Sequence, residues 1–523
     1  MMRLKRIMAL ALAFFCAAVS LAETADMADT ADMADTADQA VPVGDVTIGY
    51  VAQSGAKLNP FLCEERDLVS INSLVYESLF ELDISMQPQP LLAETWSKDG
   101  KTWTIKVRSG VTFHNGVELV AQDVVSSFEY FAAAGSNNPY SGRLELIASI
   151  QALDSFTLEV KAKYPGLITL YALTFPIVQR DTASGSMPMG TGPYWYIGYQ
   201  DSVYIRLESN PLWWKQQPTV GSVVFRHYWD VGQLLDALQS GEIDMFQTRS
   251  TTAALTKKLS YTTSIDYTSS MYEMLVPNLS GIMGDVNLRR AVMYAIDYNT
   301  LISNVYLDMA QQSEVPIPPA SWLYETRSAV YYYSPERALQ YMYDSGWADL
   351  TGDAMLNKVE NDHLRYVDVR IITYDDATSN VRGNAAAQIA ENLRSVGINA
   401  TVQVYSRSKL QERIKDGEYD LALVAVNLSE VPDISPMLTD RGDVNLNNYH
   451  ADELDALLVD ALSADDEAHM KNAYSALQTY IVEKLPVMGI CYRTGMVLAN
   501  RPLTGLNATR ETDAYNGMEF FIK

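Results

Sequence analysis

The chain has 523 residues and a formal net charge of -25. At this length more than one domain is expected, because a single hydrophobic core stops growing at about 250–300 residues. The acidity excludes a nucleic-acid partner held through its phosphates, since such a surface needs clustered lysine and arginine that no segment provides.

The N-terminus is typical of an export signal. MMRLKR is a basic segment, IMALALAFFCAAV is apolar, and Ser20–Ala22 supplies small residues for cleavage. We therefore predict a signal peptide over residues 1–22 and an exported bacterial protein, in the periplasm or at the outer face of the cytoplasmic membrane. A lipoprotein anchored through Cys16 is the alternative, which Phe15 disfavours because lipid attachment needs a small residue before the cysteine. Residues 23–43, with their TADMAD repeat, are predicted to be an extended acidic linker.

Two cysteines, Cys63 and Cys491, remain beyond the predicted leader. In an exported chain they permit one disulfide that joins the two ends of the sequence. Two separate buried thiols are the alternative, and the sequence does not decide between them. The sequence has neither a CxxC pair nor a zinc-ligand spacing, so no metal site is predicted.

From Gly44 onward, short strands alternate with helices. GDVTIGYVA is a β-branched strand, and ETWSKDGKTWTIKVRSG alternates on both sides of Asp99-Gly100, a dipeptide suited to a tight hairpin turn. AQDVVSSFEYFAAAG then predicts a helix with Asp123 near its start. In NLRRAVMYAIDYNTLISNVY, apolar residues recur at i, i+3 and i+4, and Asp297 is placed to cap a second helix together with Thr300.

The order of elements over residues 365–427 indicates a parallel sheet covered by helices. RYVDVRIITY, AAAQIAENLRSVGI, ATVQVYS, KLQERIKDG and YDLALVAVN run strand, helix, strand, helix, strand. Ligands of such sheets gather beyond the carboxyl ends of the strands. The last strand is followed by Glu430 and Asp433, two carboxylates that flank Pro432, and we place a candidate site there.

A series of segments along the chain matches a known family. In chain order they are GVTFHNGVELVAQDVVSSFEYF, ALDSFTLEVKAKYP, GTGPYWYIGY followed by ESNPLWW, ALQSGEIDMF, LRRAVMYAIDYNTLI with IPPASW, and SPERALQYMYDSGW. These segments resemble the successive signature segments of the extracellular solute-binding proteins (family 5) of peptide and nickel ABC importers. Each segment alone is a weak signal, and their order makes the resemblance specific from Gly44 to Lys523.

The resemblance implies an α/β fold of two lobes, the periplasmic-binding-protein or Venus flytrap fold, with an extra subdomain inserted in lobe I. Lobe I would comprise residues 44–265, with the insertion at about 61–185, and the returning segment 487–523. Lobe II would comprise residues 266–486. The ligand would be enclosed between the lobes, and the chain would cross between them near SIDYTSSMYEM and LPVMGICY.

The resemblance also implies roles for the two carboxylates. Peptide-binding members hold the α-ammonium group of the ligand with an Asp in a D-x-x-[DE]-P loop, and Glu430 stands in that place, with Ile434 where the family usually has Pro. A charge-assisted hydrogen bond to a desolvated ammonium group is favourable when the charge is paired. Asp433 is a second candidate for ligand binding, and a cap of the turn that contains PML is its alternative role.

The sequence indicates less clearly which residues would bind the other end of the ligand. Dipeptide-specific members supply an Arg after the strand equivalent to VRIITY, whereas this chain has the acidic segment 374–377. Arg382 is a candidate substitute, and an exposed cation at a helix start is its alternative role. Longer peptides, cationic ligands or ligands outside the peptide class fit the acidic segment better than a strict dipeptide. Further candidates for the cleft lining, which otherwise belong to the core or the surface, are Trp322, Tyr324, Tyr492 and Arg493.

We predict from these features a binding protein without enzymatic activity. It would capture peptides, with oligopeptides preferred, and deliver them to the permease subunits of an ABC transporter. It is expected to be a monomer that uses no cofactor and binds no nucleic acid. Another ligand class on the same scaffold, such as a metal chelate, a sugar or a signalling peptide, is the alternative. An exported hydrolase ranks last, because the sequence shows no nucleophile with its base.

Overall fold

The computed structural model describes residues 44–521, apart from 53–56, 64, 136–137, 376–379, 441, 501 and 503. The predicted leader with Cys16, the predicted acidic linker, and Asp376 and Ala377 of the acidic segment lie outside the described residues. Among the residues that the structure describes, no helix is long and apolar enough to cross a membrane.

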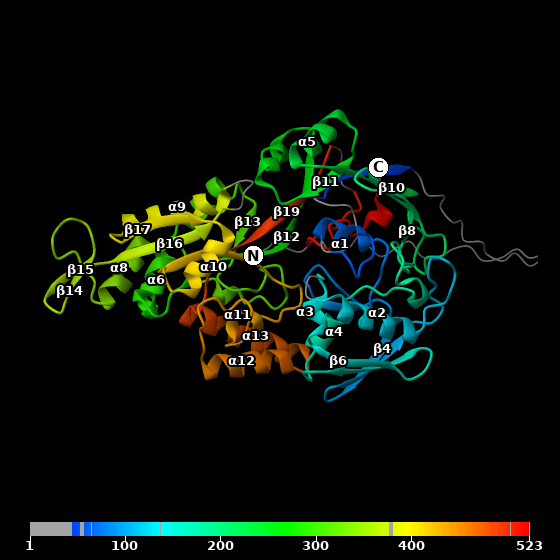
Figure 1. Ribbon diagram of the computed structural model, residues 1–523, viewed down its shortest axis with the longest axis horizontal. Helices are drawn as coiled ribbons and strands as arrows, with labels where there is room; N and C mark the ends of the chain where they lie inside the picture. Colours follow the sequence, from blue (N-terminus) through cyan, green and yellow to red (C-terminus); the bar gives the residue numbers. More distant parts are fainter. Residues whose placement is uncertain are drawn as a thin grey trace, which may run out of the picture. The chain divides into compact units, whose positions relative to one another are not determined.

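One sheet of eleven strands organises the described chain (Figure 1). Its order is β17-β16-β18-β12-β19-β11-β1-β10-β9-β8, and β13 pairs with β19 beside this path. The bounds of these strands are β17 (Asn399–Tyr405), β16 (Asp368–Tyr374), β18 (Leu421–Asn427), β12 (Thr263–Pro277), β19 (Met488–Ala499), β11 (Met245–Thr248), β1 (Asp45–Val51), β10 (Ser222–Tyr228), β9 (Tyr204–Ser209), β8 (Tyr194–Gln200) and β13 (Ala310–Gln312). The sheet thus combines strands from the beginning, the middle and the end of the chain.

The two ends of this sheet have different strand directions. At one end β1 is parallel to β10 and β11, and β10, β9 and β8 are antiparallel neighbours. At the other end β16 is parallel to β17 and β18, as the strand-helix alternation predicts. Helix α9 (Val381–Ser395) packs against β16 and β17 and buries Ala385, Ile389 and Leu393, which the four-residue spacing places on one helix face.

Two long strands, β12 and β19, lie in the middle of the sheet and join its two parts. In β12, residues 263–268 pair with the end of β19, and residues 271–277 pair with β18. The register between β12 and β19 shifts between Thr268 and Tyr272, where three residues of β12 stand opposite Arg493 alone. We call residues 268–270, which begin this irregularity, the β12 bulge. The segments predicted as crossings between lobes lie in β12 and β19, while the lobe boundaries stay a prediction.

A separate four-stranded sheet lies within residues 61–185, the segment predicted as an insertion. Its order is β4 (Ala93–Asp99), β5 (Thr102–Val107), β7 (Thr157–Ala162) and β6 (Ile147–Ala152). The predicted hairpin joins β4 and β5: Asp99 pairs with Thr102, and Gly100 adopts a φ of 57° in the turn. Glycine reaches this left-handed conformation without the steric strain that a Cβ would cause.

The predicted helix starts are confirmed by hydrogen bonds. In α2 (Ala121–Ala134), Asp123 Oδ2 accepts a hydrogen bond from Val120 N at 3.1 Å. Between α6 (Val286–Ala295) and α7 (Tyr298–Thr300), Asp297 accepts from Thr300 N at 3.1 Å and from Thr300 Oγ1 at 2.6 Å. Such bonds satisfy N–H groups of the first turn that no carbonyl within the helix reaches.

The other helices and strands of the described chain cover or extend these sheets. The helices are α1 (Arg66–Asn72), α3 (Ser141–Leu144), α4 (Ile168–Ala172), α5 (Val231–Ser240), α8 (Pro335–Asp344), α10 (Arg407–Lys415), α11 (Ser435–Leu438), α12 (Asp452–Ser463) and α13 (Glu467–Lys484). Two small antiparallel pairs are formed by β2 (Phe80–Leu82) with β3 (Pro88–Pro90) and by β14 (Asn357–Glu360) with β15 (His363–Tyr366).

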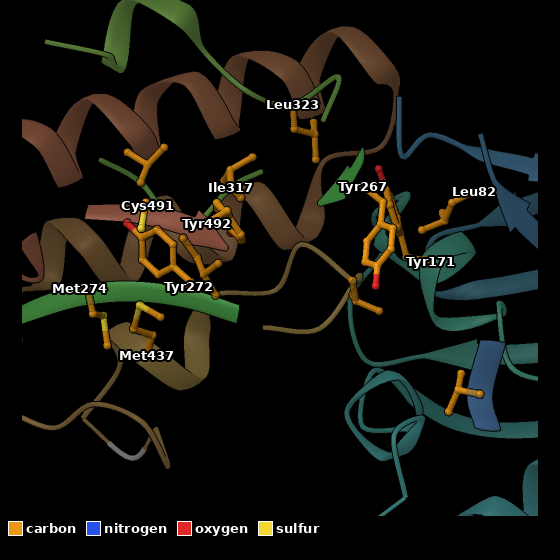
Figure 2. Close-up of a cluster of buried hydrophobic side chains, with 14 of the residues drawn as sticks. Leu82, Tyr171, Tyr267, Tyr272, Met274, Ile317, Leu323, Met437, Cys491 and Tyr492 are labelled. Atoms are coloured by element: carbon orange, nitrogen blue, oxygen red, sulfur yellow. The ribbon is translucent and has the colours of Figure 1, made fainter. Parts of the chain in front are cut away.

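The two cysteines are separate buried thiols, so the disulfide alternative is wrong. Cys63 Sγ donates a hydrogen bond to Glu65 O at 3.4 Å. Cys491 lies in β19 next to Tyr492 (Figure 2), and burial raises the pKa of its thiol. A protonated, inaccessible thiol is a poor nucleophile, which makes both cysteines parts of the core.

Candidate ligand-binding site

A cavity of about 540 Å³ lies next to the segment that follows β18. Its volume falls in the range of about 300–1,000 Å³ that is typical of small-molecule sites. The main segments of its lining are residues 427–434, the β12 bulge at 268–270, the loop 316–318, and residues 510–512, with Asn138, Pro139, Gly142 and Arg143. The carboxyl end of this strand is the place at which the sequence predicts a site.

The loop 427–434 is fixed in place by backbone hydrogen bonds. Leu428 N donates to Ser270 O at 2.8 Å, which ties the loop to the β12 bulge. From helix α13, Tyr474 donates its hydroxyl hydrogen to Pro432 O at 2.9 Å. Since Leu421 to Val424 of β18 are buried, the strand anchors the loop from one side and these bonds hold it from the other.

Glu430 lines this cavity and already has cationic partners within the chain. Arg143 Nη2 donates to Glu430 Oε2 at 2.6 Å. On the other oxygen, Oε1, Glu430 accepts a hydrogen bond from the Thr512 hydroxyl and lies 3.8 Å from Arg510 Nε. A second cavity of about 180 Å³ shares Arg143, Glu430 and Arg510 with the first, so this cluster separates the two cavities.

The charge state of Glu430 follows from this cluster. Burial alone would raise the pKa of its carboxyl, but the positive charges of Arg510 and Arg143 outweigh burial and hold the pKa below its usual value. Glu430 is therefore an ionised carboxylate whose charge the two guanidinium groups neutralise.

Sequence analysis missed Arg143 and Arg510, and no local signal marks either residue. Arg143 lies in the short helix α3, and its Nη1 donates to Thr174 O at 2.8 Å. Arg510 lies in the C-terminal segment and donates from Nη2 to Leu82 O at 3.0 Å. Because 287 residues separate Arg143 from Glu430, only the folded chain brings them together.

Two further predicted residues, Asp433 and Tyr492, line the cavity. Asp433 Oδ1 accepts a hydrogen bond from Ser435 N at 2.9 Å, as expected if Asp433 caps the turn that contains PML. Tyr492 is 1% exposed, and its ring centroid lies 4.9 Å from that of Tyr272 (Figure 2). Its hydroxyl has no hydrogen-bond partner among the described residues, which leaves a donor beside the cavity.

Arg382 and Arg493 lie outside the cavity lining and form a buried ion cluster with Glu273. Arg382 Nε is 3.2 Å from Glu273 Oε2, and Arg493 Nη1 is 3.5 Å from Glu273 Oε1. Arg382 is 3% exposed, so its alternative role as an exposed cation is wrong. The cluster joins α9 to β12 and β19 and balances one buried carboxylate with two guanidinium groups.

Trp322 and Tyr324 also lie outside the cavity lining. Trp322 Nε1 donates to the hydroxyl of Tyr171, a lining residue, at 2.7 Å. Tyr324 O accepts from Lys471 Nζ at 2.8 Å, and burial raises the pKa of its phenol to about 12. Trp322 therefore contacts a lining residue, Tyr171, without lining the cavity itself.

Several contacts join segments of the two predicted lobes. Trp322 N donates to Ser85 O at 2.8 Å, and Leu167 N donates to Ala464 O at 2.8 Å. Next to the second contact, a Cβ on Gly166 would come within 2.3 Å of Leu462 O, so only glycine fits. Together with the Arg143–Glu430 pair, these bonds connect segments of the two predicted lobes in the described chain.

No group of three or more His, Cys, Asp or Glu that could hold a metal ion occurs among the described residues. The polar side-chain groups of the cavity lining are carboxylates, hydroxyls, guanidinium groups and the amides of Asn138 and Asn427. They suit hydrogen bonding and ion pairing with an organic ligand.

Comparisons of the sequence and of the structure with known proteins agree with one another. The sequence profile of the bacterial extracellular solute-binding proteins, family 5 (middle region), matches residues 87–446. The oligopeptide-binding protein AppA of Bacillus subtilis is 22% identical over 498 residues, which cover 90% of each chain. Its crystal structure with a nonapeptide superposes with a TM-score of 0.64 at 21% identity, over 91% of this chain and 98% of that one. A nickel ABC transporter structure from Bacillus halodurans gives a TM-score of 0.78 at 21% identity, over 91% of this chain and 99% of the other.

Proposed function

Because the chain belongs to the bacterial extracellular solute-binding proteins of family 5, we propose that it captures peptides, with oligopeptides preferred, between its two lobes and delivers them to a permease. Proteins of this family bind peptides or other small ligands, work with ABC permeases and are not enzymes. The predicted family and the predicted α/β two-lobed fold with an inserted subdomain are confirmed. The hydrolase hypothesis is set aside for the same reason.

The observation that carries the proposal is the cavity of about 540 Å³ at the carboxyl end of β18. Distant segments of the chain meet there and supply both apolar surface, such as Met86 and Ile317, and polar groups, such as Asp433 and Tyr492. An apolar lining with a few placed polar groups is the usual composition of a ligand site. The name of the Bacillus subtilis relative supports the peptide class.

A cavity-filling variant tests the proposed ligand position. Ser429 lines the cavity, so Ser429→Trp should reduce affinity for a defined pool of peptides at least about tenfold by occupying the space. Titration calorimetry with stripped protein measures this change. Ser303→Trp, at an exposed position outside the cavity lining, is the matched control and should bind as wild type does. Equal affinity of wild type and Ser429→Trp would place the ligand elsewhere.

A different ligand class is the second candidate, because a structure of similar fold is named a nickel ABC transporter. Native mass spectrometry of the purified protein separates the candidates by the mass of the bound ligand. Peptide masses are expected. A single metal-chelate mass that persists after gel filtration would replace the peptide class.

We propose that the protein is exported through a signal peptide at residues 1–22 and acts as a monomer outside the cytoplasm. The family is described as extracellular, which supports this location. N-terminal sequencing of the protein recovered from outside the cytoplasm should give a start near residue 23. An unprocessed N-terminus would contradict the proposed export signal.

A further inference from the structure

Glu430 is already paired with groups of its own chain, unlike a carboxylate that is unpaired until a ligand cation binds. Both of its oxygens are engaged, Oε2 with Arg143 at 2.6 Å, and Oε1 with the Thr512 hydroxyl and with Arg510 at 3.8 Å. The side chain of Glu430 is 19% exposed, and that of Arg143 only 7%. A charge this buried interacts mainly with the charges nearest to it, because little water screens it.

Arg143 is held on Glu430 by its surroundings. Its Nη1 donates to Thr174 O at 2.8 Å, and its guanidinium group lies 4.9 Å from the ring centroid of Tyr140. The guanidinium plane is thus fixed by a hydrogen bond and by a cation–π contact, besides the ion pair itself. Arg143 cannot swing away into solvent without losing all three interactions.

A ligand ammonium group at Glu430 would either lie beside the guanidinium groups of Arg143 and Arg510, which repel it, or displace Arg143. The displacement would leave a buried guanidinium group without its counter-charge, which is strongly unfavourable. Arg510 adds a further positive charge, 3.8 Å from Glu430 Oε1. The ion pair within the chain is therefore favoured over an ion pair with the ligand.

We propose that Arg143 occupies the position beside Glu430 that a cationic group of the ligand would otherwise take. This part of the cavity therefore accepts ligands that have no terminal ammonium group. Peptides with a blocked N-terminus, such as N-acylated peptides, are the ligand class that follows. This ligand class rests on the proposed peptide-binding function, whereas the paired state of Glu430 does not.

A capture experiment tests the ligand class with the full chain. The protein, stripped by dialysis, is mixed with equal amounts of a casein digest and the same digest after N-acetylation, and the captured peptides are counted by mass spectrometry. Wild type should show no preference above about threefold for the form with free amines. A larger preference for free amines would overturn the proposal.

A double-mutant cycle tests the paired state of Glu430 without any ligand. Arg143→Met, Glu430→Gln and the double variant are compared with wild type by urea unfolding. The two changes should be coupled by about tenfold or more in the unfolding equilibrium constant. The Arg365–Glu360 pair is the matched control: its closest atoms are also 2.6 Å apart, but its side chains are 50% and 41% exposed. Its coupling should stay within about twofold.

The two experiments separate the two proposals. If the protein captures neither digest, the proposed peptide function is contradicted. The double-mutant cycle then tests the role of Arg143 independently of any ligand. Coupling in the Arg143–Glu430 cycle no larger than in the control overturns the proposed role of Arg143. The capture by wild type does not depend on whether a variant folds.

Discussion

Buried carboxylates around the cavity have pKa values that shift in opposite directions. The pKa of Glu430 is held below its usual value despite burial, because Arg510 and Arg143 stabilise the charged form. Burial raises the pKa of Glu314 to about 7, since Gln312 Nε2 at 2.8 Å supplies a neutral donor and no cation compensates. Glu314 Oε2 has no hydrogen-bond partner among the described residues. Glu430 therefore favours folding when ionised, and Glu314 favours folding when protonated.

Glu314 should make the protein less stable as the pH rises. Its pKa is about 7 in the folded chain against an ordinary value of 4.5, so the folded state binds a proton that the unfolded state has released between those values. The stabilisation is complete below pH 4.5 and is lost as the pH rises through 7. Glu314→Gln should remove about 3 kcal/mol of the stability difference between pH 5 and pH 8.

Urea unfolding at both pH values measures this difference. Glu412→Gln on the exposed face of α10 is the control and should retain the pH dependence of wild type between pH 5 and pH 8. An unchanged difference in Glu314→Gln would show that this carboxyl is ionised in the folded state.

The secondary-structure elements near the site were largely predictable, and their pairing was not. The hairpin at Asp99-Gly100, the caps at Asp123 and Asp297, and the strand-helix alternation over 365–427 all depend on neighbours in sequence, so the local pattern contains them. The cavity wall depends on the β12 bulge, which arises where β12 meets a strand more than 200 residues later. No local pattern predicts such an irregularity.

At the level of elements, the close contact of Gly166 with the end of α12 should be sensitive to a single methyl group. A Cβ on Gly166 would lie 2.3 Å from Leu462 O and 2.9 Å from Ala464 O, both backbone atoms that cannot turn away. Gly166→Ala should therefore destabilise the described conformation by about 1–3 kcal/mol, as overpacking does. It should also enlarge the radius of gyration in solution scattering, because this contact joins segments of the two predicted lobes.

The control for this variant is Gly198→Ala. Its nearest neighbour would be Tyr204 Cε2 at 3.5 Å, an ordinary van der Waals contact. A thermal unfolding midpoint that falls equally in both variants would contradict the importance of the Gly166 contact.

For the whole molecule, the two lobes are expected to depend on each other through shared strands. β12 pairs with β18 on one side, β19 pairs with β11 on the other, and the two strands pair with each other in the middle of the eleven-stranded sheet. The Arg143–Glu430 pair and the Leu167–Ala464 hydrogen bond add connections away from these strands. The crossings between lobes that the resemblance implies lie in β12 and β19 and stay a prediction, whereas the Arg143–Glu430 ion pair was beyond prediction because it requires the folded positions of α3 and the loop after β18.

Shared strands should make unfolding cooperative across the lobes. If one lobe lost its part of β12 or β19, a strand edge of the other lobe would lose its hydrogen-bond partners. Scanning calorimetry should therefore show one transition with equal calorimetric and van't Hoff enthalpies. Two resolved transitions would show that the lobes unfold independently. The Arg143→Met variant should broaden the transition, because it removes one connection and leaves the strands intact.

The β12 bulge has a mechanical consequence. A continuous ladder of hydrogen bonds between two strands resists bending along its whole length. The ladder between β12 and β19 is interrupted between Thr268 and Tyr272, so the strand can bend at that place and stay rigid on either side. Leu428 N donates to Ser270 O, so a flexure there would pull directly on the loop that carries Glu430. The backbone that can bend and the wall of the proposed ligand site are thus one segment, so a ligand bound at the proposed site would act directly on the point of bending.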